Sequence, residues 1–166
     1  MTVIHTIEPV YDESSRVLIL GSFPSVKSRE QGFLYGHPQN RFWRTLAAVL
    51  DEAVPDTTEE KTAMLLRNHI ALWDVISRCE ISGSDDASIR NAEANDLSRI
   101  LDTARIRRIF VNGKTAERLY KRLIEPETDV SAVLLPSTSP ANARWTPDML
   151  REAYSVILNY LGENDD

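Results

Sequence analysis

The sequence predicts an α/β fold, a three-layer sandwich in which helices flank a central four-stranded, mainly parallel sheet. Four short apolar runs predict strands, and segments with helical spacing of their apolar residues lie between them. Two of the runs, VLIL and AVLL, are apolar without alternation, which is typical of strands covered on both faces. Strands that alternate with helices in this way join through right-handed crossovers into a parallel sheet.

The expected elements follow the chain in order. The predicted strands are RVLILG, HIALWDVI, IRRIFVNG and SAVLLP, at positions 16–21, 69–76, 106–113 and 131–136. NRFWRTLAAVL and KTAERLYKRLI each place their apolar residues on one face of a helix. The last helix is expected to begin with Thr146 as its N-cap and Pro147 at its first position, and to end at Gly162.

Length and composition are those of an ordinary globular protein. The 166 residues are expected to form one domain, 1–166, because this length buries a sufficient core without a metal or a disulfide. Apolar residues make up 42% and charged residues 27%, and no apolar run approaches the roughly 18 residues of a membrane span. The N-terminus lacks the basic and apolar regions of a signal peptide. A single cysteine, Cys79, excludes a disulfide and a cysteine-rich metal or iron–sulfur site.

The net charge of −6 counts mildly against nucleic acid as a partner, because phosphate binding usually comes with a basic field. Acidic residues concentrate in DEAVPDTTEE, SDD and GENDD, whereas KSRE, RFWR and GKTAERLYKR carry basic ones. A small basic face on an acidic protein therefore remains open.

Three of the predicted strands end in a loop rich in Gly, Ser, Pro or Asn, namely GSFPS, NGK and PSTSPAN. Ligands of open parallel sheets bind just beyond the carboxyl ends of the strands. We therefore expect these loops to gather around one site, whatever the ligand is.

The first and last loops carry hydroxyl groups beside free backbone N–H groups, an arrangement that suits an anion or a base edge. Candidates in GSFPSVKS are Ser22, Ser25 and Ser28, and those in PSTSPAN are Ser137, Thr138, Ser139 and Asn142. Each loop has a plainer interpretation as well, a polar turn in the first case and a capped loop in the second.

Two further strand ends carry polar residues whose roles the sequence leaves open. Trp73 and Asp74 end an apolar strand, where the carboxylate could bind a ligand or cap a turn. Asn112 is most simply a turn residue, and Lys114 after it could meet a phosphate. The polar stretch SGSDDASIRNAEAND predicts a long functional loop that leads into a helix.

A serine-type hydrolase is one alternative, with Ser22 or Ser137 as the nucleophile and His37 as the base. The Gly-x-Ser-x-Gly elbow is absent. The other histidines, His5 and His69, lie in unpromising contexts, and His69 at a strand start is expected to be structural.

Together, GSFPS, GFLYGHPQNRFW, FVNGK and PSTSPAN resemble motifs of the uracil-DNA glycosylase superfamily, in the same order and over most of the chain. GFLYGHPQNRFW is similar to a segment of the mismatch-specific uracil/thymine branch. That branch carries a catalytic Asn in its first loop, where Phe23 stands here. The combination therefore resembles the hypoxanthine-DNA (deoxyinosine) glycosylase branch, in which the catalytic Asn comes from the His-Pro-x-Asn segment, here Asn40.

The resemblance implies a monofunctional DNA glycosylase that hydrolyses the N-glycosidic bond of a flipped, deaminated base, hypoxanthine first of all. It implies a monomer that needs neither cofactor nor metal, acts on DNA rather than at a membrane, and works in the cytoplasm at the nucleoid. Asn40 would position the attacking water, and the base would contact Ser22, Phe23, Tyr35, Trp73 and Asp74. DNA contacts would come from Ser25, Ser28, Lys114, Ser137, Thr138, Ser139, Asn142 and Arg144, with Arg144 one candidate to fill the vacated gap.

Alternatives to this interpretation are a uracil or mismatch-specific uracil/thymine glycosylase, and a DNA-binding module without catalysis. Asn40 itself has a plainer role as the N-cap of the helix that follows it, which its residue type fits. The two roles compete, because an oxygen bonded to the helix is less free to hold water.

Overall fold

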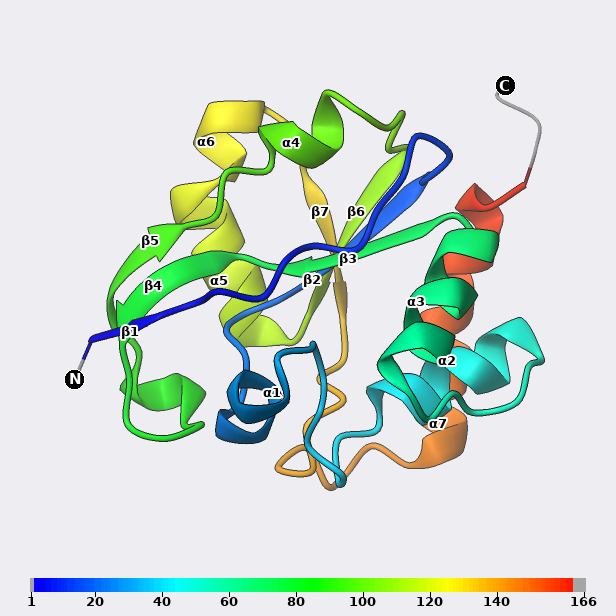
Figure 1. Cartoon of the computed structure of the whole chain (residues 1–166), viewed down its shortest axis with the longest axis horizontal. Coiled ribbons are helices and arrows are strands. Elements are labelled where there is room, and N and C mark those ends of the chain that lie inside the picture. The colour runs from blue at the N-terminus through cyan, green and yellow to red at the C-terminus, as the bar shows by residue number, and fades with distance from the viewer. Residues whose placement is uncertain (1, 163–166) are drawn as a thin grey trace.

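The computed structural model describes residues 2–162, and its centre is a four-stranded parallel sheet in the order β3-β2-β6-β7 (Figure 1). The strands are β2 (Val17–Gly21), β3 (Ile70–Asp74), β6 (Arg108–Asn112) and β7 (Ala132–Leu135). Each lies within a predicted strand, so the predicted sheet is confirmed.

Burial differs between the two edge strands of the sheet, β3 and β7. Every residue of β2 and β3 is buried, and for β2 its unbroken apolar run predicts this. The same expectation is wrong for β7, where Leu134 is 38% exposed. β3 and β7 are both edge strands, but the chain at Val10 bridges Leu72 of β3, whereas β7 is only partly covered, so a continuous apolar run does not guarantee cover on both faces.

Helices cover both faces of the sheet, with α2, α3 and α7 on one side and α5 on the other (Figure 1). Their bounds are α1 (Val26–Gln31), α2 (Phe42–Leu50), α3 (Thr58–Arg67), α4 (Ser98–Leu101), α5 (Lys114–Leu123), α6 (Glu125–Thr128) and α7 (Pro147–Tyr154). The helices predicted from NRFWRTLAAVL and KTAERLYKRLI are thus confirmed as α2 and α5. No helix among residues 2–162 is long and apolar enough to cross a membrane.

The last helix begins as predicted but ends early. The Thr146 side chain accepts a hydrogen bond from the Met149 backbone N–H, and Pro147 occupies the first turn. The α-helix then ends at Tyr154, and the chain continues as the 3₁₀ helix η2 (Ser155–Tyr160). Gly162 therefore lies beyond the helix that it was expected to end.

A second, antiparallel sheet in the order β1-β4-β5 was not predicted. Its strands are β1 (Thr2–Ile4), β4 (Ile76–Glu80) and β5 (Arg90–Ala94). β5 and the 3₁₀ helix η1 (Asp86–Ser88) occupy the stretch expected to be a loop. β5 is mostly exposed and polar, so it lacks the apolar alternation that would have predicted a strand.

The parallel strands bring the candidate residues to one edge of the sheet. Gly21 ends β2, Asp74 ends β3 and Asn112 ends β6, and Gly21 pairs directly with Asp74 in the register. The loop after β7 begins directly after Leu135, the residue that pairs with Asn112. The predicted convergence of these loops is confirmed by the contacts described next.

Candidate active site

A chain of hydrogen bonds joins two loops to the end of β6 at the carboxyl edge of the sheet. The side-chain amide of Asn112 donates to the Tyr35 hydroxyl (3.1 Å) and to Thr138 Oγ1 (3.0 Å). Its carbonyl oxygen accepts from the Thr138 backbone N–H (3.1 Å). Thr138 Oγ1 in turn donates to Asn40 Oδ1 (2.8 Å). Asn112, expected to be only a turn residue, is therefore the residue that connects the loops.

Asn40 has its amide orientation fixed by its neighbours. Its Oδ1 accepts from the Phe42 backbone N–H (2.9 Å) as well as from the Thr138 hydroxyl. Because both partners are donors, the oxygen must face them, and Nδ2 faces the other way. The N-cap of α2 is Arg41 and not, as expected, Asn40, but the Asn40 oxygen still supports the start of this helix. The group left for a ligand or a water is Nδ2.

Tyr35 is held by its ring, its hydroxyl and its backbone. Its ring stacks on Phe42 with centroids 4.1 Å apart, and its φ of 53° lies in the left-handed region. The hydroxyl lies over Gly21, where an added Cβ would come within 2.7 Å of it. Burial, with the nearby Asp74 carboxylate, raises the pKa of the Tyr35 hydroxyl well above its ordinary value, so it stays protonated and able to donate.

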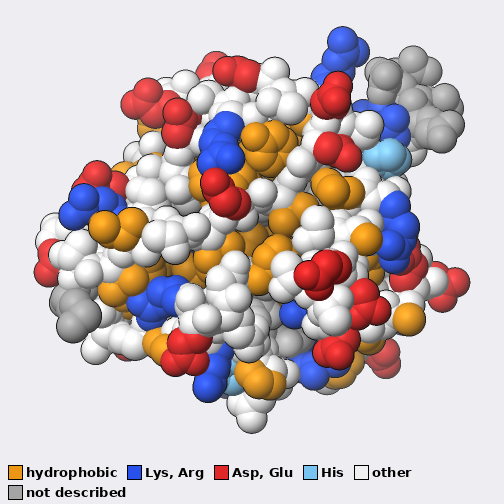
Figure 2. Space-filling view, in the orientation of Figure 1, with side chains coloured by type: hydrophobic (Ala, Val, Ile, Leu, Met, Phe, Trp, Pro, Cys, Tyr) orange, Lys and Arg blue, Asp and Glu red, His pale blue; other side chains and the backbone are white. Residues whose placement is uncertain are grey.

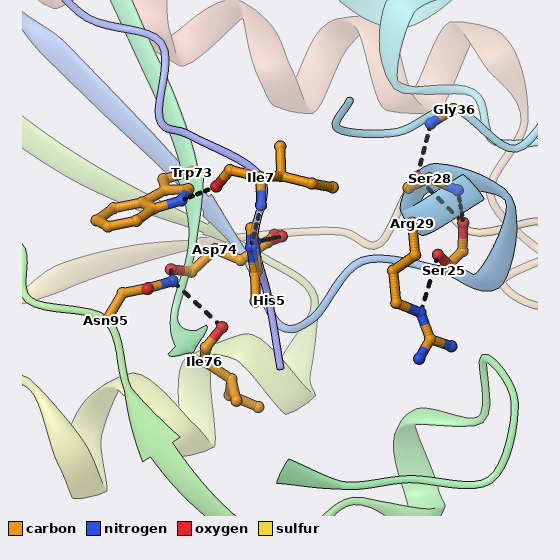
Figure 3. Close-up of polar contacts among 10 residues, drawn as sticks. All are labelled: His5, Ile7, Ser25, Ser28, Arg29, Gly36, Trp73, Asp74, Ile76 and Asn95. Atoms are coloured by element: carbon orange, nitrogen blue, oxygen red, sulfur yellow. Dashed lines mark hydrogen bonds and ion pairs between the residues drawn. The ribbon is translucent and has the colours of Figure 1, made fainter. Parts of the chain in front are cut away.

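Asp74 is buried beside Tyr35 and bonded to a histidine. Its Oδ2 lies 2.9 Å from His5 Nε2, and a Cβ added to Gly21 would come within 2.4 Å of its Oδ1. His5 follows β1, far from Asp74 in the sequence, and the two meet because the chain after His5 runs along β3 (Figure 3). A second carboxylate lies close by, since Asp86 accepts from the Ser22 hydroxyl (2.9 Å).

Asp86 belongs to the stretch after β4 that was expected to be a functional loop. Burial raises the pKa of the Asp86 carboxyl, the Ser22 hydroxyl partly offsets this, and Asp74 adds to it.

The bond between Ser22 and Asp86 also bears on the serine hydrolase alternative. Ser22 has a carboxylate as its partner, while His37 Nδ1 accepts from the Gln39 backbone N–H (3.1 Å). No nucleophile–histidine pair forms among the described residues, so that alternative is wrong.

The loop after β2 holds the loop that carries Tyr35 in place. Ser25 caps α1, and its hydroxyl bonds to Ser28. Ser28 is 1% exposed and accepts from the Gly36 backbone N–H (2.8 Å), which fixes the loop that carries Tyr35 (Figure 3). Phe23 is also buried, with its ring edge-on to His5. Ser28 therefore has a supporting role in place of the expected contact with DNA.

The loop after β7 is fastened to the Asn40 loop by Arg41. The Arg41 guanidinium donates to the backbone oxygens of Ser139, Asn142 and Trp145. Thr138 is fully buried, so its side chain ties the loops together and does not reach DNA.

The remaining predicted residues lie at the periphery or elsewhere. Ser137, Ser139 and Asn142 are half-buried, and their side chains bond within the loop. Lys114 at the start of α5 and Arg144 are exposed. Trp73 is buried, with its indole N–H donating to the Ile7 carbonyl and its ring beneath Arg99, and it is not part of the bonded group around Asn112.

Comparison with known proteins identifies the family. A model of the uracil DNA glycosylase superfamily matches residues 8–161. The chain belongs to the uracil DNA glycosylase superfamily. A hypoxanthine DNA glycosylase of Methanosarcina acetivorans is 38% identical over 89% of this chain and 94% of its own. One of Methanosarcina barkeri is 35% identical over 82% of this chain and 86% of its own.

A solved structure shows the same superfamily fold. The solution NMR structure of a candidate uracil DNA glycosylase from Methanosarcina acetivorans has a TM-score of 0.78 at 31% identity. It covers 95% of this chain and 99% of that one. The predicted family and the predicted α/β fold are both confirmed.

Sequence reasoning missed four residues that build this glycosylase-superfamily site. Asn112 and Arg41 lay inside recognised motifs but had been interpreted as turn and helix residues. His5 and Asp86 come from segments without a motif, so only the folded structure reveals them. The available signal was position, since Asn112 ends a strand just as Asp74 does.

The surface is mixed in charge on one face. In Figure 2 basic and acidic side chains are interspersed, with hydrophobic ones visible between them.

Within residues 2–162, no group of three or more His, Cys, Asp or Glu could hold a metal ion.

Proposed function

We propose that this protein is a monofunctional DNA glycosylase that removes hypoxanthine from DNA and leaves an abasic site. The observation that carries the proposal is the bonded group of Tyr35, Asn112, Thr138 and Asn40, with Asp74 beside it, at the ligand-binding edge of a superfamily fold. The names of the two relatives support hypoxanthine as the base.

Recognition of the base is assigned to Asp74. Hypoxanthine carries a hydrogen on N1, which a carboxylate oxygen accepts, whereas adenine presents a lone pair there and is repelled. Oδ2 of Asp74 is engaged by His5, so Oδ1 is the oxygen that meets the base. The flipped nucleotide enters more easily when it is mispaired, as hypoxanthine opposite thymine is.

Tyr35 is proposed to stack on the base. Phe42 covers one face of its ring, so a base would stack on the opposite face. Such stacking contributes about 1–3 kcal/mol of binding free energy. Backbone N–H groups of Ser22 and Phe23 would then stabilise the negative charge that develops on the departing base. Trp73 is buried with its ring edge-on to His5, so it would support the base site through that histidine.

Asn40 is proposed to hold the water that attacks the sugar. The glycosidic bond breaks with its electron pair on the base, the sugar carbon gains positive charge, and the oxygen of the water bonds to that carbon. The proton that this water loses passes through solvent to the departing base, which leaves as the neutral free base. An amide does not ionise this water. Asn40 would orient it through Nδ2, the one polar atom of its side chain not turned to Phe42 and Thr138.

DNA contacts are assigned to the rim of the site. Ser137, Ser139, Asn142 and Ser25 would bond phosphates with hydroxyl, amide or backbone groups, and Lys114 would add charge. Arg144, which is exposed on the loop after β7, is proposed to fill the gap left by the flipped base. We propose further that the protein acts as a monomer, without a metal, on DNA of the nucleoid.

The proposal is tested with matched duplexes that carry hypoxanthine, uracil, xanthine or no lesion, followed by alkaline cleavage at abasic sites. We expect hypoxanthine to give the fastest cleavage, and undamaged DNA none. Excision of uracil alone would support the second candidate, a uracil glycosylase, which the name of the solved structure favours. Binding to every duplex without product would leave only a DNA-binding module.

A further inference from the structure

We infer that His5 is a positioning residue: its Nε2–H holds Oδ2 of Asp74 so that Oδ1 faces the target base, and it would fix the polarity of an amide placed at position 74. The inference rests on the proposed function, since it concerns the base-recognition role assigned to Asp74. It concerns a histidine whose sequence context gave no sign of a role.

The backbone determines which nitrogen of His5 carries the hydrogen. The Ile7 backbone N–H donates to His5 Nδ1 at 3.0 Å, so Nδ1 must be the acceptor (Figure 3). Neutral imidazole has one donor and one acceptor, so the hydrogen is on Nε2. Nε2–H therefore donates to Asp74 Oδ2, 2.9 Å away.

Packing prevents the imidazole from turning over. The His5 side chain has no exposed surface, and its ring meets those of Phe23 and Trp73 edge-on, with centroids 5.9 Å and 6.4 Å apart. The Trp73 indole is itself bonded to the Ile7 carbonyl (2.9 Å). One short segment, residues 5–7, thus fixes both the tautomer and the orientation of the ring.

Asp74 has little freedom either. Its side chain is 5% exposed, and its backbone oxygen accepts from the Asn95 side chain (2.9 Å). With Oδ2 on His5, Oδ1 lies over Gly21, beside the Tyr35 hydroxyl. An acceptor therefore stands at the base site, where it pairs with the ring N–H that deamination creates.

Because His5 Nε2–H is a fixed donor, it determines how an amide at position 74 would be oriented. In Asp74→Asn, the only stable arrangement places the amide oxygen on His5 Nε2–H, which turns the NH₂ group to the base. The site then presents a donor where it had an acceptor. Such a site rejects the N1–H of hypoxanthine and suits the N1 lone pair of adenine.

The test combines this variant with a histidine replacement. Asp74→Asn alone is expected to lower hypoxanthine release by about 100-fold or more, because the donors of enzyme and base face each other. Its ratio of adenine to hypoxanthine release is expected to rise. In Asp74→Asn with His5→Gln, the glutamine can offer its oxygen to the asparagine NH₂, and both amides can turn over. Hypoxanthine release is then expected to recover at least about tenfold over Asp74→Asn.

The controls separate positioning from folding. His5→Gln with Asp74 present keeps a donor for Oδ2, and we expect it to reduce hypoxanthine release by less than about tenfold. His69→Gln changes a histidine outside the site and is expected to change nothing. Thermal melting of each variant shows whether it folds at the assay temperature. If Asp74→Asn does not fold, His5→Leu must lower hypoxanthine-over-adenine discrimination more than His5→Gln does.

The inference is overturned if folded Asp74→Asn excises hypoxanthine at the wild-type rate, or if adding His5→Gln brings no recovery. Equal discrimination in His5→Leu and His5→Gln would also overturn it. A wild-type protein that releases no base from any lesion duplex is a different result, because it contradicts the proposed function itself.

Discussion

The guanidinium of Arg41 donates a hydrogen bond of 3.0 Å to the backbone oxygen of Asn142. It bonds in the same way to Ser139 and Trp145, and the Arg41 backbone N–H donates to the Thr138 oxygen. One planar side chain thus joins the loop that carries the proposed water-positioning Asn to the loop that is proposed to bind phosphates. The geometry depends on several donors in one plane, which Arg has and Lys lacks.

Arg41→Lys is therefore expected to loosen the loop after β7 while leaving the base site intact. Loss of these charge-assisted bonds is expected to lower the free energy of unfolding by about 1–3 kcal/mol. KM for a hypoxanthine duplex should rise more than kcat falls, because the loop acts on binding. Steady-state kinetics and chemical denaturation measure the two effects.

A matched control is Arg122→Lys, at an exposed position near the end of α5. We expect it to change neither KM nor stability. An Arg41→Lys enzyme with wild-type KM would show that the loop keeps its position without this side chain.

Asn40 is expected to lose its two roles separately in two substitutions. Asn40→Ser keeps an oxygen that can accept from the Phe42 backbone N–H but removes Nδ2, the proposed contact to water. Excision should fall about 100-fold with little loss of melting temperature. Asn40→Ala removes the oxygen too and should lower stability by about a further 1 kcal/mol. Wild-type excision by Asn40→Ser would reduce Asn40 to a structural support for α2.

The central fold could be predicted from the sequence because its signals are local. Unbroken apolar runs such as that of β2, and the Thr146-Pro147 helix start, each depend on neighbouring residues. The second sheet has no such signal, because β5 is exposed and its pairing with β4 depends on tertiary contacts.

The edge of the sheet at which the candidate site lies was predictable, because polar residues such as Asp74 end apolar strands there. The site itself was not predictable where function depends on partners distant in sequence. His5 reaches Asp74 across 69 positions, and Asp86 reaches Ser22 across 64. Motif position also could not distinguish a buried hydroxyl from an accessible one, so Thr138 and Ser28 were expected at DNA while the fold uses them internally.

Gly21→Ala is expected to disturb the base site directly. The new Cβ would lie 2.4 Å from Asp74 Oδ1 and 2.7 Å from the Tyr35 hydroxyl, and both side chains are held by other bonds. Overpacking of this kind costs about 1–3 kcal/mol of stability. Hypoxanthine release should fall with it, by about tenfold or more.

Gly162→Ala is the matched control for this substitution, since no atom of the described residues other than its chain neighbours lies within 4 Å of the Cβ it would add. Excision rates and thermal melting should match wild type. Unchanged activity in Gly21→Ala would mean that the Asp74 carboxylate is free to move aside, which would contradict its fixed position.

Asp86→Asn is expected to stabilise the protein at neutral pH and to remove part of its pH dependence. Burial raises the pKa of the Asp86 carboxyl, so the native state binds this proton more tightly than the unfolded chain does. Stability is therefore lost as the pH rises from the ordinary pKa of 3.8 through the raised pKa, where the buried group becomes charged. Asn keeps an oxygen for the Ser22 hydroxyl and carries no charge.

Chemical denaturation at a series of pH values tests this expectation. The unfolding free energies of Asp86→Asn and wild type should agree most closely below the ordinary pKa and diverge above it, with the variant the more stable. Asp102→Asn, at an exposed position at the end of α4, should track wild type throughout because that residue is exposed to solvent. A lower unfolding free energy for Asp86→Asn than for wild type at neutral pH would contradict this expectation. It would mean that the site stabilises the charged carboxylate, for instance through its bond to Ser22.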